Sequence, residues 1–274
     1  VQESFLQICT GRPRPVEIEI PPEVLSEVAD SPNYLRAKIP RVAINQKSVE
    51  NGAAIITSSK NPVIWAGGGV HLSEASNELL ALAEYLQIPI LTTPEGKGSI
   101  SDQHYLSIGT PQSRSTGNSK DPLRDFFYTR DVILAVGTRF AYANPKPYQQ
   151  VVQIDVDPKE IGRNHKKTFG ILGDARQALS QLLEVIKIKT KPKQNQKIVF
   201  DKMRSNRYEN PANQVEPLAS YVKALRQGMP DDAILVTDMT TIAYVTRPEF
   251  IMKATGGFDG KVKGNLSQPE AVPG

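Results

Sequence analysis

The chain has 274 residues, of which 39% are hydrophobic and 23% charged, with a formal net charge of +4. This composition is typical of a globular protein of one large or two modest domains, and the lack of any run of about 18 apolar residues argues against a membrane-spanning helix. The single cysteine, Cys9, cannot form an internal disulfide and fits a reducing compartment, so we expect a cytoplasmic protein without a secretion signal.

The first 44 residues are expected to be the end of one domain and a linker. Val16, Ile18 and Ile20 alternate with glutamates, which is typical of a half-buried strand, and a pair of prolines ends the pattern. Because the stretch is too short to be a domain, we interpret residues 1–28 as the tail of one. Residues 29–44 are punctuated by proline and are interpreted as a linker.

Residues 45–186 are predicted to form a compact domain. Short, nearly continuous apolar runs alternate with helical patterns, as in parallel strands that are covered on both faces. The predicted strands are Val63–Ala66, Ile88–Leu91, Val132–Val136, Val151–Ile154 and Phe169–Leu172. One predicted helix buries Leu79, Leu82, Ala83 and Leu86 after a cap at Ser73, and another follows Asp174. The pattern predicts an α/β fold with a doubly wound parallel sheet, similar to the Rossmann fold.

The remaining residues divide into three further pieces. Residues 187–214 are rich in lysine, but Pro192 and several amides interrupt any helical face and no aromatic residues interleave, which favours a solvated linker over a nucleic-acid site. Residues 215–250 read as a helix and a strand, Ile234–Val236, that begin another α/β domain. Residues 251–274 form a polar, glycine-rich tail. We therefore expect this chain to be a piece of a longer protein.

Ligands of open parallel sheets bind beyond the carboxyl ends of the strands, so the residues that follow each strand are the candidates for chemistry. Gly67, Gly68 and Gly69 follow the first strand and either approach an anionic ligand or form a tight turn without one. Leu72 occupies the position of the third glycine of the dinucleotide fingerprint. No Gly-Lys-Ser/Thr sequence follows the glycines, which excludes a phosphate-binding loop.

Other strand ends supply a hydroxyl, an arginine and an acid. Thr92 suits a phosphate or sugar, or a polar turn; Arg139 suits a pyrophosphate, or a surface ion pair. Asp155 suits ribose hydroxyls, whereas Asp157 suits a turn. A phosphatase-like pair of aspartates is disfavoured, because such a site needs further carboxylates at the same edge and Asp174 is the only obvious candidate. This set favours holding an extended nucleotide, and it contains no nucleophile with a base; His71, His104 and His165 lack metal-ligand spacing.

Five stretches in register carry a resemblance to a known family: GRPRPVEIEIPPEVL, NPVIWAGGGV, ALAEYLQIPILTT, DVILAVGTRF and VVQIDVDPKEIGRNHKKTFGILGDA. Over about residues 10–250 the chain resembles the central region of thiamine-diphosphate-dependent enzymes, most closely the acetolactate synthase group. The resemblance implies pyrimidine-binding, central and pyrophosphate-binding domains, here residues 1–28, 45–186 and 215–250. It also implies that the central domain holds a nucleotide through Gly67, Gly68, Gly69, Thr92, Gly109, Arg139, Asp155, Val156 and Asp174.

The resemblance implies further properties of the complete enzyme. It is expected to act on a 2-oxo acid such as pyruvate with thiamine diphosphate and Mg²⁺, as a homo-oligomer whose active sites lie between subunits. The family's activating glutamate would precede Val1, and its Gly-Asp-Gly metal motif does not occur, since Phe258 precedes Asp259. We therefore expect no catalytic or metal-binding residue here, and no decarboxylase or carboligase activity from this chain alone.

The sequence does not decide which nucleotide the central domain binds. The family's His-Gly pattern does not follow Gly109, and Ala141-Tyr142 stand where FAD-binding synthases have two aspartates. FAD, ADP and an empty crevice are the alternatives. A noncatalytic nucleotide-binding or scaffold module is the alternative function. A nicotinamide oxidoreductase is disfavoured by the incomplete fingerprint.

Overall fold

The computed structural model describes the chain except for residues 29–42, 112–120, 142, 210–215, 238–239 and 254–274. It divides into two compact units, Val1–Ala43 and Ile44–Gly274. The first unit contains helices α1 (Gln2–Cys9) and α2 (Pro22–Leu25), and neither helix has a buried residue. No helix among the described residues of the chain is both long and apolar enough to span a membrane.

The strand predicted around Val16, Ile18 and Ile20 is wrong. These residues belong to no strand, and their side chains are 39%, 48% and 46% exposed. A strand is held by hydrogen bonds to a neighbouring strand, and the described part of this unit provides no such neighbour. Alternation by itself therefore does not fold this segment.

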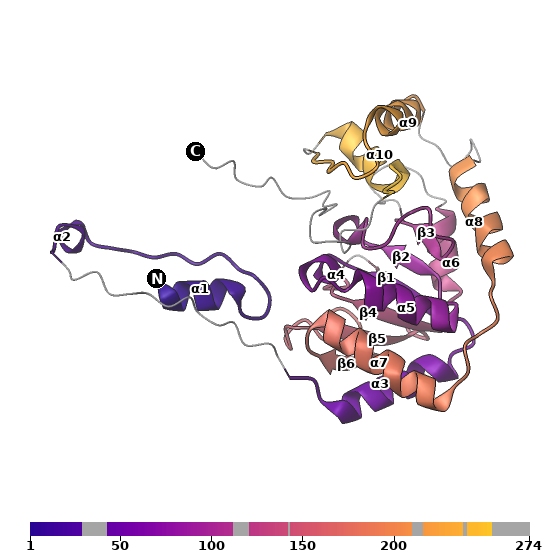
Figure 1. The fold of residues 1–274 in the computed structure, drawn as a ribbon, viewed down its shortest axis with the longest axis horizontal. Coiled ribbons are helices and arrows are strands. Elements are labelled where there is room, and N and C mark those ends of the chain that lie inside the picture. The colour runs from indigo at the N-terminus through magenta and orange to yellow at the C-terminus, as the bar shows by residue number, and fades with distance from the viewer. Residues whose placement is uncertain (29–42, 112–120, 142, 210–215, 238–239, 254–274) are drawn as a thin grey trace. The chain divides into compact units, whose positions relative to one another are not determined.

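The second unit is built on a six-stranded parallel sheet, shown in Figure 1, with strand order β3-β2-β1-β4-β5-β6. The prediction of a doubly wound parallel α/β fold is confirmed. The central strands form because their apolar side chains are covered on both faces, which suits short continuous runs of Val, Ile and Leu. The strands are β1 (Val63–Ala66), β2 (Ile90–Thr92), β3 (Ser107–Gly109), β4 (Val132–Val136), β5 (Gln150–Asp155) and β6 (Thr168–Leu172).

The register of the sheet shows which helices cover which face. Ile64, Leu134 and Val152 pair in one row, and an added Cβ on Gly52 of α3 (Gln46–Ser58) would meet Val152. Trp65 lies in the next row, on the opposite face, and its ring packs against the tilted ring of Phe127 in α6 (Pro122–Tyr128), with the ring centroids 4.9 Å apart. Helices α3 and α6 therefore cover opposite faces, as in a doubly wound sheet.

Two further helices complete the layer that contains α3. Helix α5 (Ser76–Leu86) buries the predicted face of Leu79, Leu82, Ala83 and Leu86, and α7 (Ala175–Lys189) packs against both α3 and α5 (Figure 1). The predicted cap of α5 at Ser73 is wrong, because a separate short helix, α4 (Gly69–Leu72), precedes it. Ser73 ends α4, and Glu74 then takes a positive φ of 52° before α5 begins. A 3₁₀ turn, η1 (Pro94–Gly96), follows β2.

The carboxyl-terminal part forms a small second core. Helices α9 (Leu218–Gly228) and α10 (Thr241–Glu249) pack together around Val222, Val245, Phe250 and Met252. The strand predicted at Ile234–Val236 is wrong, since these residues form no strand and pair with no described strand. Helix α8 (Lys197–Glu209) lies in the stretch expected as a linker without a helical face, and that expectation is wrong for its residues because the helix begins beyond Pro192.

Candidate functional site

The candidate site lies at the carboxyl edge of the sheet, where β1 and β4 are neighbours. The chain runs from β1 outward through β2 to β3, then returns to the other side of β1 with β4. The point at which strand order reverses is where open α/β sheets bind ligands, because the two connections leave in opposite directions and open a crevice. The turns after β1 and β4, with Gly67–Gly69 and Gly137–Arg139, both begin there.

The glycines after β1 are required by close backbone packing. A Cβ on Gly67 would lie 2.5 Å from the carbonyl oxygen of Gly137, and a Cβ on Gly69 would lie 2.5 Å from the Cα of Gly137. The N–H groups of Gly67 and Gly69 donate to Val136 and Gly137. The N–H of Gly68 forms no hydrogen bond with a described residue. Of the three glycines, Gly68 is therefore the one whose N–H is available to a ligand.

A buried glutamine fixes the turn that carries Arg139. Gln153 of β5 is 2% exposed, and its Nε2 donates to the carbonyl oxygens of Thr138 (3.2 Å) and Glu160 (3.1 Å). Asn164 Nδ2 also donates to the carbonyl oxygen of Arg139 at 2.8 Å. The Arg139 side chain is exposed, and it forms no salt bridge with a described residue. Its backbone is thus anchored while its guanidinium remains available for an anion.

The two aspartates at this edge have structural partners. Asp155 ends β5, is 4% exposed, and its Oδ1 accepts a hydrogen bond from the N–H of Asp157 at 2.9 Å. Val156 lies between Asp155 and Asp157 in the sequence. Asp174 is the N-cap of α7, where its Oδ1 accepts from the N–H of Gln177 at 3.2 Å. An aspartate before a helix is explained by this cap without a ligand.

Thr92 and Gly109 end β2 and β3, on the same edge of the sheet. The Thr92 hydroxyl is buried and lies 2.6 Å from the hydroxyl of Thr110, the residue after Gly109. Gly109 has a φ of 113°, a backbone conformation that favours glycine. The structure thus brings all nine residues expected as nucleotide contacts to the ends of strands β1 to β6 at one edge, and it gives Thr92, Asp155 and Asp174 partners of their own.

These residues fit an adenine nucleotide in part. An unpaired arginine, a free glycine N–H and a buried acid along one edge of the sheet are complementary to a pyrophosphate and a ribose. The close contact of Gly67 and Gly69 with Gly137 means that two of the three glycines do not leave open space for a phosphate. The fit therefore depends on Gly68, Arg139 and Asp155.

A buried ion pair near this edge was missed by the sequence analysis. Lys97 and Asp102 are both 0% exposed, with Lys97 Nζ 2.9 Å from Asp102 Oδ2. Asp102 also accepts from the Ser107 hydroxyl and from the N–H of Met252, and the Asp102 N–H donates back to the Met252 carbonyl. The sequence offers no signal for this pair beyond a spacing of five residues in a polar loop.

His71 lies in the short helix after the glycines. Its Nε2 is 3.1 Å from the carbonyl oxygen of Lys97. Burial lowers the pKa of His71 below its usual value, although contacts with the backbone of Lys97 and Gly96 oppose this shift. The buried site therefore favours the neutral imidazole. Among the described residues, no group of three or more His, Cys, Asp or Glu side chains is arranged to hold a metal ion.

Comparison with known proteins connects this sheet to one family. The family described as "Thiamine pyrophosphate enzyme, central domain" matches residues 49–182, from α3 into α7. A probable acetolactate synthase large subunit of Methanocaldococcus jannaschii is 35% identical over 198 residues, covering 67% of this chain and 32% of that protein. The acetolactate synthase large subunit of Corynebacterium glutamicum is 32% identical over 202 residues, or 68% of this chain and 30% of that protein. That of Buchnera aphidicola is 28% identical over 236 residues, or 79% and 40%.

Proposed function

Since the chain belongs to the thiamine pyrophosphate enzymes and its central domain is similar to that of acetolactate synthase large subunits, we propose that it is the central part of a 2-oxo acid decarboxylase or carboligase. The observation that carries the proposal is the coincidence of the family match, residues 49–182, with the parallel sheet and its covering helices. The match spans about a third of the length of these relatives, and the activity is accordingly proposed for a longer protein that contains this chain.

The role proposed for the central domain is to hold FAD or an adenine nucleotide at the carboxyl edge of the sheet. Arg139 supplies a cation for the pyrophosphate, Gly68 an N–H donor, and Asp155 an acceptor for ribose hydroxyls. The support is the unpaired guanidinium of Arg139 on an anchored turn, beside the point where strand order reverses. The nucleotide has a structural role in this proposal, because the described residues of this edge offer no nucleophile with an adjacent base.

The test of this role is the absorbance of the purified protein, followed by titration with FAD and with ADP. Flavin bands that copurify select FAD, and a colourless protein that binds ADP selects the adenine nucleotide. Arg139→Gln is expected to weaken the bound nucleotide about tenfold, the usual loss for one charge-assisted hydrogen bond. Lys166→Gln is the matched control, since this exposed lysine precedes β6 at the opposite edge. A protein that binds neither nucleotide, or loses both equally in the two variants, contradicts the proposal.

The complete enzyme is proposed to use thiamine diphosphate with Mg²⁺ and to act on pyruvate as a homo-oligomer in the cytoplasm. Thiamine diphosphate supplies the carbanion chemistry when bound. Residues 1–28 and 215–250 are proposed as the end of the pyrimidine-binding domain and the start of the pyrophosphate-binding domain. The present chain alone is expected to form no acetolactate from pyruvate with both cofactors added, and detectable product in a colorimetric assay would contradict this division of labour.

A further inference from the structure

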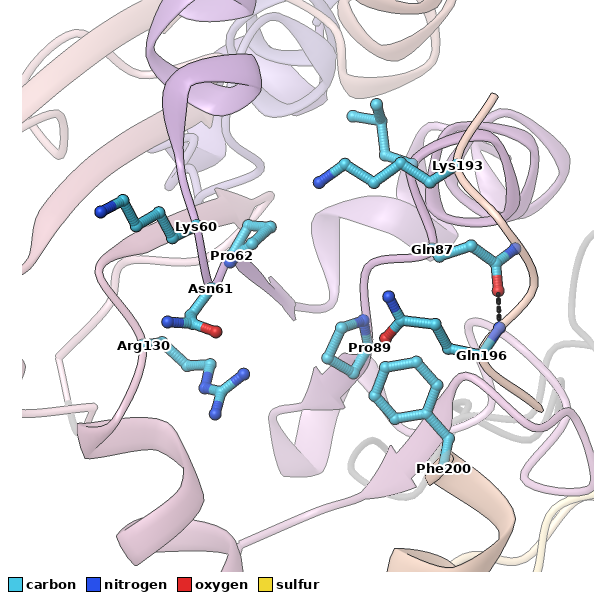
Figure 2. Close-up of a pocket in the computed structure, with 10 residues that line it drawn as sticks. Lys60, Asn61, Pro62, Gln87, Pro89, Arg130, Lys193, Gln196 and Phe200 are labelled. Carbon is cyan, nitrogen blue, oxygen red and sulfur yellow. Dashed lines mark hydrogen bonds between the residues drawn. The ribbon is translucent and has the colours of Figure 1, made fainter. Parts of the chain in front are cut away.

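We infer that the amino edge of the same sheet carries a second site, which binds a phosphate group. The site is a pocket of about 130 Å³ at the start of β1, β2 and β4, remote in the sheet from the carboxyl edge. Figure 2 shows Arg130 and Asn61 on one side of it, Gln196 and Phe200 on the other, and the amine of Lys193 reaching toward it from a third side.

The backbone of this pocket is held in place on each side. The N–H of Lys193 donates to the carbonyl oxygen of Tyr85 at 2.9 Å, and the N–H of Gln196 donates to the side-chain oxygen of Gln87 at 3.1 Å. These bonds fasten the segment between α7 and α8 onto the end of α5. On the opposite side, the N–H of Asn61 donates to Asp131 at 3.0 Å. The backbone on both sides of the pocket is therefore held in place by hydrogen bonds.

The charges that line the pocket are all positive. Lys60, Arg130 and Lys193 line it, and no lining residue is acidic. None of the three cations forms a salt bridge with a described residue. The nearby acid, Asp131, accepts hydrogen bonds from Ser59 and from the N–H groups of Lys60 and Asn61, so its carboxylate is already satisfied. An anion in this pocket meets cations without a competing carboxylate among the lining residues.

Arg130 is the strongest reason to expect a doubly charged oxyanion. Its Nε donates to the Phe126 carbonyl oxygen at 3.3 Å and, with Nη2, to the Thr129 hydroxyl at 3.1 and 2.7 Å, and its guanidinium lies 4.0 Å from the Phe126 ring centroid. Burial lowers the pKa of Arg130, while the charge of Asp131 opposes the shift. A partly buried guanidinium without an ion pair is stabilised by a phosphate, which its planar group can bind. The positive charge of Lys193, which also lines the pocket, adds to the attraction for an anion.

The ligand is either inorganic phosphate or a small phosphoester, since both present the same group. The apolar wall formed by Pro62, Pro89 and Phe200 accommodates the organic part of an ester. In Figure 2 the amine of Lys60 points away from the space, so this lysine contributes less than Lys193. The site is independent of the proposed nucleotide, because its residues lie at the other ends of the strands.

The test is isothermal titration of the whole chain with inorganic phosphate and, in a second arm, with glycerol 3-phosphate. Arg130→Gln is expected to raise the dissociation constant for phosphate about tenfold. Lys193→Gln is expected to raise it about threefold, as is usual for one exposed charge. Lys193 is exposed, so this variant is expected to fold normally. Tighter binding of glycerol 3-phosphate identifies an ester as the ligand, and tighter binding of inorganic phosphate identifies free phosphate.

Two controls separate this site from the carboxyl edge. Lys47→Gln removes an exposed positive charge at the other end of α3 and is expected to leave phosphate binding unchanged. Lys159→Gln, at an exposed lysine beyond the carboxyl end of β5, is also expected to leave it unchanged. Wild-type affinity in both pocket variants, loss of affinity in Lys159→Gln, or failure of the wild type to bind either probe would overturn the inference.

Discussion

The glycines that follow β1 are required by their close contacts with the turn after β4. Gly69 and Gly137 approach so closely that a Cβ on either would lie 2.5 Å from the Cα of the other, and Gly137 also has a φ of 59°. Backbone atoms cannot move aside as a flexible side chain can. The sequence analysis considered an anion cradle and a tight turn for this triplet, and the contacts of Gly67 and Gly69 favour the turn, without testing a ligand at Gly68.

Gly69→Ala is therefore expected to lower the free energy of unfolding by about 2–3 kcal/mol, the cost of overpacking a close contact. Urea denaturation of the purified variant measures this. Gly228→Ala is the control, because a Cβ there meets nothing within 4 Å and the residue lies in α9. The control is expected to be neutral or slightly stabilising, since alanine favours helix. Equal stability of both variants would mean that the turns after β1 and β4 can separate freely.

Asp131 stabilises the start of β4 through its own hydrogen bonds. Its carboxylate accepts from the Ser59 hydroxyl and from the N–H groups of Lys60 (2.8 Å), Asn61 (3.0 Å) and Val132 (2.9 Å). Burial raises the pKa of Asp131, but these hydrogen bonds outweigh it, and the pKa lies below its usual value. The folded state therefore prefers the ionised form, which connects the loop after α3 to the sheet.

Asp131→Asn is expected to lower the free energy of unfolding by about 2 kcal/mol at pH 7, because the amide turns a donor toward several donors. A lowered pKa stabilises the fold above the unfolded value of about 3.9 and loses this effect as pH falls through the folded value. The difference between wild type and variant is thus constant from about pH 6 to 8 and shrinks toward pH 3. Asp232→Asn, an exposed control, is expected to show no such difference. A gap that persists at pH 3 would contradict the role of the charge.

Among the elements, the loop after β2 is joined to three others by one buried residue, Asp102. Asp102 binds Lys97 in its own loop, the Ser107 hydroxyl at the start of β3, and the backbone of Met252 beyond α10. Arg204 of α8 donates to its carbonyl oxygen. Because both charges are fully buried, each depends on the other for its solvation.

Lys97→Met is expected to lower the free energy of unfolding by about 3–5 kcal/mol, because it leaves the Asp102 carboxylate buried without a counter-ion. The double variant with Asp102→Asn is expected to lose less than the sum of the two single variants, which a double-mutant cycle measures. Hydrogen exchange at the Met252 amide is expected to accelerate in Asp102→Ala, since its acceptor is removed. Additive single effects would show that the two charges do not depend on each other.

The elements that could be predicted from the sequence are those whose pattern is independent of distant partners. The runs that became β1 and β4 were predicted with their observed bounds, because continuous burial requires continuous apolar sequence. Strand β3 was missed, since its sequence, Ser107-Ile108-Gly109, is short and carries no pattern. The edge residues could be placed because parallel strands end together. The pair of Lys97 and Asp102 could not, because it depends on packing around a loop.

At the scale of the whole molecule, the two compact units differ in what holds them together. The unit from Ile44 onward contains the sheet, its covering helices and the core around them. In the unit from Val1 to Ala43, neither helix buries a residue, and Phe5, Leu25 and Val28 are largely exposed. The free energy of unfolding of the chain should therefore reside in the second unit, because burial of apolar surface is the main stabilising contribution.

A chain that begins at Ile44 is accordingly expected to unfold at the same urea concentration as the full chain, and with nearly the same dependence on urea. That dependence scales with the surface exposed on unfolding, and residues without a buried core add little to it. The matched control is a chain that ends at Glu216, which removes α9, α10 and the Met252 contacts of Asp102. It is expected to unfold at lower urea, because the carboxylate then loses a donor and the small second core is gone. If the truncation at Ile44 lowers the midpoint as much as the truncation at Glu216, residues 1–43 contribute burial comparable to that of the second core.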